Sequence, residues 1–245
     1  MSKSEYTLAI QIKNILLGLN KYSRSNHISL DDNNILHIEK LPFSIRENIV
    51  LDGFDLDARF MRHKSPLQDD MVNMDKIDAL FEKLSELGGN LLLNHIGFCY
   101  KETDIKEETA RLLEFCRLKK LGLYHETLVG FDPWFFVGDK EDKSSPMLEF
   151  LPTTIIPPDW EKTKDHWLPQ VQIDIDTDLN SADIAQIYNA IFEGKTELFT
   201  LFKNNNGVIL YRLRIGVLDG VNINLDIGTS ERNTLWYRNK ILKKL

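Results

Sequence analysis

The sequence predicts an α+β protein of two tandem βαβββ units behind an N-terminal extension of one helix and short irregular strands. Two observations carry this prediction. A strand, a helix and three further strands follow one another between residues 91 and 151, and the same order returns between residues 171 and 227. A segment rich in proline and polar residues separates the two runs. The predicted boundaries are residues 1–64 for the extension, 65–152 for the first unit, 153–170 for the linker and 171–245 for the second unit.

The N-terminal extension opens on an amphipathic helix whose apolar positions run from Leu8 to Leu19. Alternating residues at 35–41 and 48–60 predict short strands. Apolar residues at helical spacing then predict a helix over residues 70–87, which Gly88 and Gly89 end. This helix leads into the first unit.

The first unit begins with a predicted strand at 91–100. Asp104, with Glu107 three residues later, forms a capping box for a helix that continues through Cys116. Three strand-like runs follow at 123–129, 134–137 and 147–151, with turn residues between them.

The second unit begins with a predicted strand at 171–176. Ser181 is expected to cap a helix that ends at Gly194. Three strands are predicted at 197–202, 208–215 and 221–227, and the turn at 204–207, Asn-Asn-Asn-Gly, joins the first two as a hairpin.

Composition narrows the class of protein. The 245-residue chain is 42% hydrophobic and 27% charged, which predicts a folded protein. Its formal net charge of -7 provides no general positive field to hold a phosphate backbone, so nucleic acid is not an expected partner, although a local basic site is possible. No signal peptide and no apolar run of membrane-spanning length is apparent. Two cysteines outside any CxxC pair predict a reducing, cytoplasmic location. The oligomeric state does not follow from the sequence.

Short motifs in the first unit give the strongest indication of function. The segments Asn94-His-Ile-Gly-Phe98 and Met147-Leu-Glu-Phe-Leu151, on either side of a predicted helix, resemble the glyoxalase-like (vicinal oxygen chelate) superfamily. With the leading helix and His166-Trp167 downstream, the chain is similar to the bacterial YecM-type proteins of that superfamily, which are candidate metal binders. The resemblance implies a divalent metal held by a first-strand histidine and a fourth-strand glutamate, here His95 and Glu149.

The second unit supplies two further residues by analogy. When the first and last strands of the two units are aligned, Gln172 occupies the position equivalent to His95, and Asp226 occupies the position equivalent to Glu149. Both separations are 54 residues (149 minus 95, and 226 minus 172). The resemblance therefore implies His95, Glu149, Gln172 and Asp226 as ligands of Zn, Fe(II), Mn or Ni. Other polar residues on the same strand faces could replace the last two, namely Asp174, Asp176 and Asn224.

Four groups of residues are candidates for substrate chemistry. His125 and Glu126 lie on opposite faces of one strand, so only one of them can act as a general base in the cleft. Alternating Arg212 and Arg214 could bind a carboxylate or phosphate, although such a pair is more often a solvated face that balances the acidic strands beside it. The remaining two candidates, for the pocket wall, are Trp134 and His166; for Trp134 a core position is the alternative.

These residues favour a metal-dependent enzyme that acts on a small oxygen-rich metabolite by proton transfer, as an isomerase or lyase. A non-catalytic ligand-binding or resistance-type module with the same cup is the first alternative, and an Fe(II)-dependent dioxygenase is the second. The dioxygenase is less favoured because no second histidine ligand is evident. An interaction protein that acts through residues 1–64 is a further possibility. The phosphate-loop, nucleophile-elbow and helical zinc-protease motifs are absent from the sequence.

Overall fold

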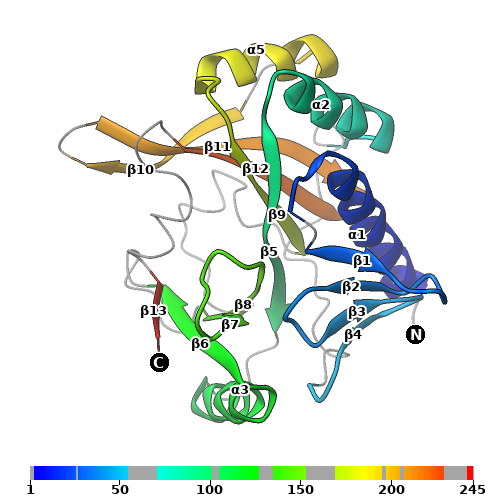
Figure 1. The fold of residues 1–245 in the computed structure, drawn as a ribbon, viewed down its shortest axis with the longest axis vertical. Helices are drawn as coiled ribbons and strands as arrows, with labels where there is room; N and C mark the ends of the chain where they lie inside the picture. Colours follow the sequence, from blue (N-terminus) through cyan, green and yellow to red (C-terminus); the bar gives the residue numbers. More distant parts are fainter. Residues whose placement is uncertain are drawn as a thin grey trace.

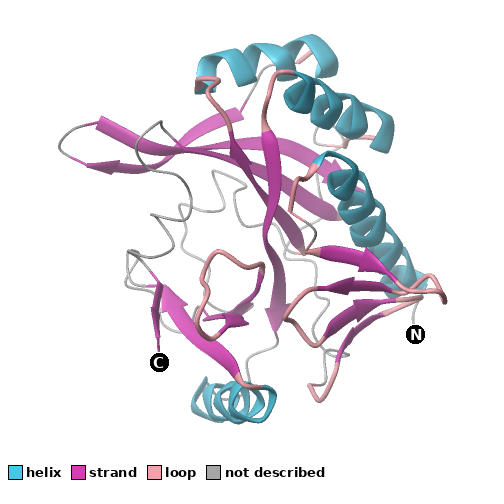
Figure 2. Ribbon diagram, in the orientation of Figure 1, coloured by secondary structure: helices cyan, strands magenta, loops and turns pink. Residues whose placement is uncertain are grey.

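The computed structural model describes residues 3–25, 27–54, 71–100, 105–126, 135–152, 169–194, 197–204, 207–228 and 242–244. Within these residues the fold is α+β, with four helices, one four-stranded sheet and one nine-stranded sheet (Figures 1 and 2). The helices are α1 (Lys3–Tyr22), α2 (Met74–Glu86), α3 (Ile105–Lys119) and α5 (Ser181–Phe192). The strands are β1 (Ile28–Leu30), β2 (Leu36–Ile38), β3 (Phe43–Ile45), β4 (Ile49–Leu51), β5 (Asn90–Tyr100), β6 (Leu121–Glu126), β7 (Phe135–Asp139), β8 (Met147–Pro152), β9 (Gln170–Asp176), β10 (Glu197–Asn204), β11 (Gly207–Leu218), β12 (Val221–Gly228) and β13 (Leu242–Lys244).

The N-terminal extension is more regular than the sequence predicts. Its helix α1 buries the expected apolar face, and strands β1 to β4 form an antiparallel sheet in sequential order. Strands β2 and β4 fall inside the two predicted runs, whereas β1 and β3 were not predicted. All four strands have three residues, too few for alternation to be distinguished from chance. Positions 55–60 of the second predicted run lie outside the described residues.

Helix α2 begins later than its apolar pattern suggests. The side chain of Asn73 accepts a hydrogen bond from the backbone N–H of Lys76 at 2.9 Å, which makes Asn73 the N-cap. Just before it, the N–H of Val72 donates to the carbonyl of Val217 in β11 at 3.0 Å. Residues 71 and 72 therefore run beside the large sheet, and the predicted start at residue 70 is wrong.

Both ends of helix α5 lie one residue before the residues predicted to cap and to end it. The side chain of Asn180 accepts from the N–H groups of Ala182 and Asp183, so Asn180 rather than Ser181 is the cap. At the other end Glu193, not Gly194, adopts the left-handed conformation, with φ of 56°. The sequence pattern alone could not decide between Asn180 and Ser181 as the N-cap, because asparagine and serine are both good N-cap residues.

The nine-stranded sheet has the order β10-β11-β12-β9-β5-β8-β7-β6-β13. Strand β5 pairs in parallel with β8, and β9 pairs in parallel with β12. The two pairs join through an antiparallel contact between β5 and β9 at the centre of the sheet. Strand β13, which was not predicted, pairs antiparallel with β6 at one edge. Figure 1 shows the long central strand β5 running from the helices α2 and α5 toward α3.

One face of this sheet is apolar and packs against the helices and the N-terminal sheet. Ile96 and Phe98 of β5 are completely or almost completely buried there. The ring of Phe98 contacts that of Phe43 from β3, with centroids 6.3 Å apart, and that of Phe150 from β8, at 6.4 Å. The hydrophobic core therefore occupies one side of the sheet, which leaves the other side for polar residues.

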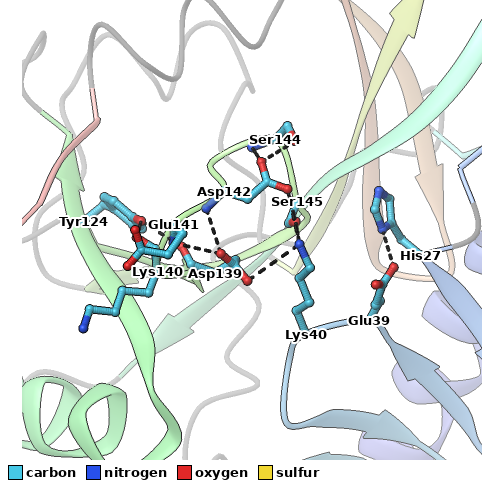
Figure 3. Close-up of polar contacts among 10 residues, drawn as sticks. All are labelled: His27, Glu39, Lys40, Tyr124, Asp139, Lys140, Glu141, Asp142, Ser144 and Ser145. Carbon is cyan, nitrogen blue, oxygen red and sulfur yellow. Dashed lines mark hydrogen bonds and ion pairs between the residues drawn. The ribbon is translucent and has the colours of Figure 1, made fainter.

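A lysine connects the small sheet to the loop between β7 and β8 (Figure 3). The Nζ of Lys40 lies 3.3 Å from Oδ2 of Asp142 and 3.8 Å from Oδ2 of Asp139. The same Asp142 carboxylate accepts hydrogen bonds from Ser144 and Ser145 of its own loop. The hydrogen bond from the Ser144 hydroxyl, above all, holds the pKa of Asp142 well below its usual range.

We expect Asp142→Asn to lower the melting temperature at pH 7 by about 2–4 °C, because the partly exposed carboxylate is worth about 1 kcal/mol or less. The folded pKa is depressed, so this stabilisation is present above the unfolded pKa and is lost as the pH falls below about 4. Melting curves between pH 7 and pH 2 should therefore converge for the two proteins. The exposed Asp32→Asn serves as the control, and an equal difference at both pH values would refute the prediction.

Candidate functional site

The second face of the nine-stranded sheet carries a set of buried polar side chains, here called the polar face. Strands β9 and β12 show the reason, because apolar residues alternate along them with polar ones. In a soluble protein such alternation usually marks a solvated face, yet here only Asp176, at the end of β9, is exposed, and the other polar residues of the two strands are at most 6% exposed. The polar face comprises His95, Glu149, Gln170, Gln172, Asp174, Arg212, Arg214, Asn222, Asn224 and Asp226.

Strand register arranges the polar face in three rows that cross the sheet. The row through the centre contains Arg214, Asn224, Gln172 and His95 on successive strands. A second row, on one side of it, contains Asn222, Gln170, Gly97 and Glu149. A third row, on the other side, contains Arg212, Asp226 and Asp174. Residues far apart in sequence therefore become lateral neighbours.

The structure brings together the two residues on which the predicted site depends. Nε2 of His95 lies 3.3 Å from Oε2 of Glu149, and the side chains are only 8% and 1% exposed. The ring of Phe136 from β7 meets the His95 ring edge-on, with centroids 5.4 Å apart. Two ionisable groups thus share a buried position beside an aromatic wall.

A β-bulge turns His95 toward the polar face. In the pairing of β5 with β9, Leu93 lies opposite Ile173 and His95 lies opposite Gln172, so Asn94 is the extra residue. The insertion changes which positions face the core, from odd numbers at Leu93 to even numbers at Ile96. Because residues 91 to 93 are all leucine, the sequence does not show where the parity changes, and the bulge could not be located from it.

Asn94 fixes the tautomer of His95. Its Nδ2 donates to Oδ1 of Asp174 at 2.6 Å, so its Oδ1 must face Nδ1 of His95, which lies 2.8 Å away. The imidazole therefore carries its proton on Nδ1 and presents the lone pair of Nε2 toward Glu149. A lone pair and a carboxylate oxygen at 3.3 Å repel unless a proton or a cation lies between them.

Gln170 joins His95 and Glu149 in the candidate site, although it was not predicted from the sequence. Its Nε2 donates to Oε2 of Glu149 at 2.6 Å and lies 3.2 Å from Nε2 of His95. Its Oε1 accepts from Nδ2 of Asn224 at 3.2 Å. The predicted strand began at residue 171, and extending its alternation back by one position would have placed Gln170 beside Gln172.

Gly97 lies between Gln170 and Glu149 in the register and leaves space for their contact. We expect Gly97→Val to separate the two side chains, because the valine would stand on the polar face between them. Metal retention by the purified protein should fall about 10- to 100-fold, the usual effect of disturbing groups that orient ligands. Cys116→Val on α3 is the control, and unchanged retention in Gly97→Val would count against this arrangement.

Asp226 lies in a different environment from the one expected for a ligand. Its carboxylate accepts two hydrogen bonds from Arg212, from Nε at 2.8 Å and from Nη2 at 3.2 Å. Strand β12 is separated from β5 by β9, a distance of about 10 Å between strand axes.

Gln172, in contrast, lies directly opposite His95, and its Oε1 has no hydrogen-bond partner among the described residues.

The remaining predicted residues fall into two groups. His125 pairs with Phe135, which pairs with Phe150, so its position falls on the apolar face, opposite to Glu149. This register removes His125 from the candidates for a base beside His95. Glu126 follows it in β6, and the side chain of Glu126 lies outside the described part of the structure. Trp134 and His166 lie outside the described residues.

Whether a divalent ion could bind here depends on which side chains can coordinate it and on the distance between them. Across the described parts of the chain, no group of three or more His, Cys, Asp or Glu side chains could hold a metal ion. A site here must therefore use amide oxygens besides His95 and Glu149. Two ligands about 2.0–2.1 Å from one tetrahedral ion are about 3.4 Å apart, close to the observed 3.3 Å. The pair is thus spaced for a shared ion.

No family model, curated protein or solved structure matches this chain. In the described part of the molecule, no helix is both long and apolar enough to cross a membrane.

Proposed function

We propose that the protein is a cytoplasmic, metal-dependent enzyme of the glyoxalase-like type that transfers a proton on a small oxygen-rich metabolite. The strand order supports the two-unit reading. Strands β5-β8-β7-β6 and β9-β12-β11-β10 have the same order of first, last, third and second strand, and each first strand runs parallel to its last. The two first strands are adjacent, which suits a cup shared by both units.

The observation that carries the proposal is the close approach of His95 and Glu149 on the buried polar face. A carboxylate at 1% exposure requires a cation or several donors to offset its desolvation. The Nε2 lone pair, oriented by Asn94, supplies a neutral nitrogen ligand directly beside it.

An amide oxygen completes the proposed ligand set. In the structure Gln170 directs its Nε2 to Glu149. A half-turn of the amide would direct Oε1 toward an ion beside Glu149 instead, since the two ends of the amide are nearly identical in shape. Asn224 can follow that turn, because its own Oδ1 has no partner among the described residues. A divalent ion held by these groups would supply Lewis acidity for a bound carbonyl or carboxylate oxygen.

Other residues of the polar face have separate tasks in the proposed reaction. The buried guanidinium of Arg214, in the same row as His95, would attract an acidic or carbonyl end of the substrate. Glu126 is the proposed base, because the register removes His125, the other base candidate on β6. Burial of the whole face excludes water, which strengthens each of these interactions.

The test is proton exchange in deuterated water. Protein reconstituted separately with Zn, Mn, Ni or Fe(II) is mixed with a panel of α-hydroxy carbonyl compounds and hydroxy acids, and NMR follows the loss of the signal of the proton beside the carbonyl. We expect exchange that requires metal and is lost in Glu126→Gln but not in His125→Gln. Oxygen uptake with Fe(II), without proton exchange, would instead establish a dioxygenase.

A non-catalytic binding module is the second candidate. The observation that favours it is the Gln170 amide, which already bridges Glu149 and His95 without an ion. Ligand binding by metal-free protein, with no exchange under any metal, would support this candidate and contradict the enzyme.

A further inference from the structure

Four carboxamide side chains occupy adjacent positions on strands β9 and β12, and three of them have polar atoms without partners. Gln172, Asn222 and Asn224 are at most 1% exposed. Among the described residues, Oε1 of Gln172, Oδ1 of Asn224 and both polar atoms of Asn222 have no hydrogen-bond partner. The fourth, Gln170, is fully engaged with Asn224, Glu149 and His95.

Such burial is costly, so these atoms require an explanation. A buried polar atom without a partner costs about 1–3 kcal/mol, and folded proteins contain few of them. Here four lie on one face of two neighbouring strands, because Asn224 is opposite Gln172 and Asn222 is opposite Gln170. Their concentration at one place points to a bound ligand that supplies the missing hydrogen bonds.

The partnerless atoms define what that ligand must offer. Three are carbonyl oxygens and one is an N–H₂ group, so the ligand needs several donors and at least one acceptor. Hydroxyl groups are both donors and acceptors. The strand positions that carry these side chains are about 5 Å apart between strands and about 7 Å apart along a strand, a span that one short carbon chain with several hydroxyls can cover.

A cation is a poor alternative occupant. Arg214 is 4% exposed and lies directly opposite Asn224 in the register, so a positive charge already borders the carboxamides. The calcium sites of proteins also use carboxylates, and no carboxylate is among the four partnerless atoms. An uncharged or acidic ligand fits the electrostatics better.

We propose that Gln172, Asn222 and Asn224 bind the adjacent hydroxyl groups of a small polyol or polyhydroxy acid. The inference deepens the proposed function, since it names the substrate class of the same buried face. It does not require the metal, because none of the three side chains contacts His95 or Glu149 in the structure through a described hydrogen bond.

The test compares erythritol and erythronate with butanol and butyrate, which have the same carbon chain without the adjacent hydroxyls. Binding to the full chain is measured by calorimetry and by saturation-transfer NMR, with and without Zn. We expect each hydroxylated probe to bind at least about tenfold more tightly than its control. Tighter binding of erythronate than of erythritol identifies an acid as the natural class, and the reverse identifies a polyol.

Apolar isosteres keep the test independent of folding. Gln172→Met and Asn222→Leu preserve shape, remove partnerless atoms and should raise the melting temperature of the ligand-free protein while weakening erythritol binding about tenfold. Metal content of Asn222→Leu should stay unchanged, because Asn222 is not among the candidate ligands, so failure of the metal proposal is seen separately. Equal binding of hydroxylated and control probes, or lower stability of both variants, would overturn the inference, since the amides would then serve the fold alone.

Discussion

Replacing His95 with alanine is expected to lower the affinity for a divalent ion by at least about 100-fold, and Glu149→Gln is expected to do the same. Disturbing groups that merely orient ligands already costs 10- to 100-fold, so loss of a ligand should cost more. Glu149→Gln keeps the shape of the buried side chain, which is 1% exposed, and therefore separates metal binding from packing. Elemental analysis after reconstitution and desalting, together with titration by Zn, provides the measurement.

The matched control is His125→Ala, since His125 pairs with Phe135 on the apolar face of the sheet. This variant should retain the ion at wild-type stoichiometry. If His95→Ala and His125→Ala retain equal amounts of metal, the assignment of His95 as a ligand fails.

Asp226→Ala is expected to destabilise the protein by about 3–5 kcal/mol, because it removes the carboxylate that accepts two hydrogen bonds from the buried guanidinium of Arg212. The side chains are 7% and 3% exposed, so water cannot replace the lost contact. For a chain of this size the melting temperature should fall by about 6–20 °C. Thermal and urea unfolding measure the change.

A double substitution separates the ion pair from its surroundings. Arg212→Met with Asp226→Leu removes both charges and should recover most of the lost stability, since an apolar pair is commonly as stable as a buried ion pair. Lys83→Ala, which breaks an exposed pair with Glu86, is the control and should cost less than about 1 kcal/mol. If Asp226→Ala costs no more than this control, the buried ion pair does not stabilise the fold. If it removes metal from folded protein, Asp226 has the ligand role that the resemblance implied.

The elements that could be predicted from the sequence are those with long apolar patterns. Helix α2 and strands β9 and β12 follow from the spacing of their apolar residues, with errors of a few residues at the ends. Among the three-residue strands, β2 and β4 lie inside longer alternating runs that predict strands, whereas β1, β3 and β13 lie in no such run and were not predicted. Their strand geometry depends on pairing with neighbours rather than on local pattern.

Part of the candidate site could be predicted from short motifs, and the rest depends on strand register. His95 and Glu149 were found through motifs, and the register now shows why they meet: parallel pairing places Glu149 beside Gly97, two positions from His95. Gln170 was missed because its position at the end of β9 carries no motif. The pairing of Asp226 with Arg212 depends on the register of β11 against β12, which one sequence does not contain.

The most direct measurement is a crystal structure of Zn-reconstituted protein with anomalous scattering recorded at the zinc edge. The account predicts one ion per chain, within about 2.0–2.2 Å of both Nε2 of His95 and Oε2 of Glu149. A hydrogen-bonded imidazolium and carboxylate with no ion between them, or an ion bound only elsewhere, would contradict it.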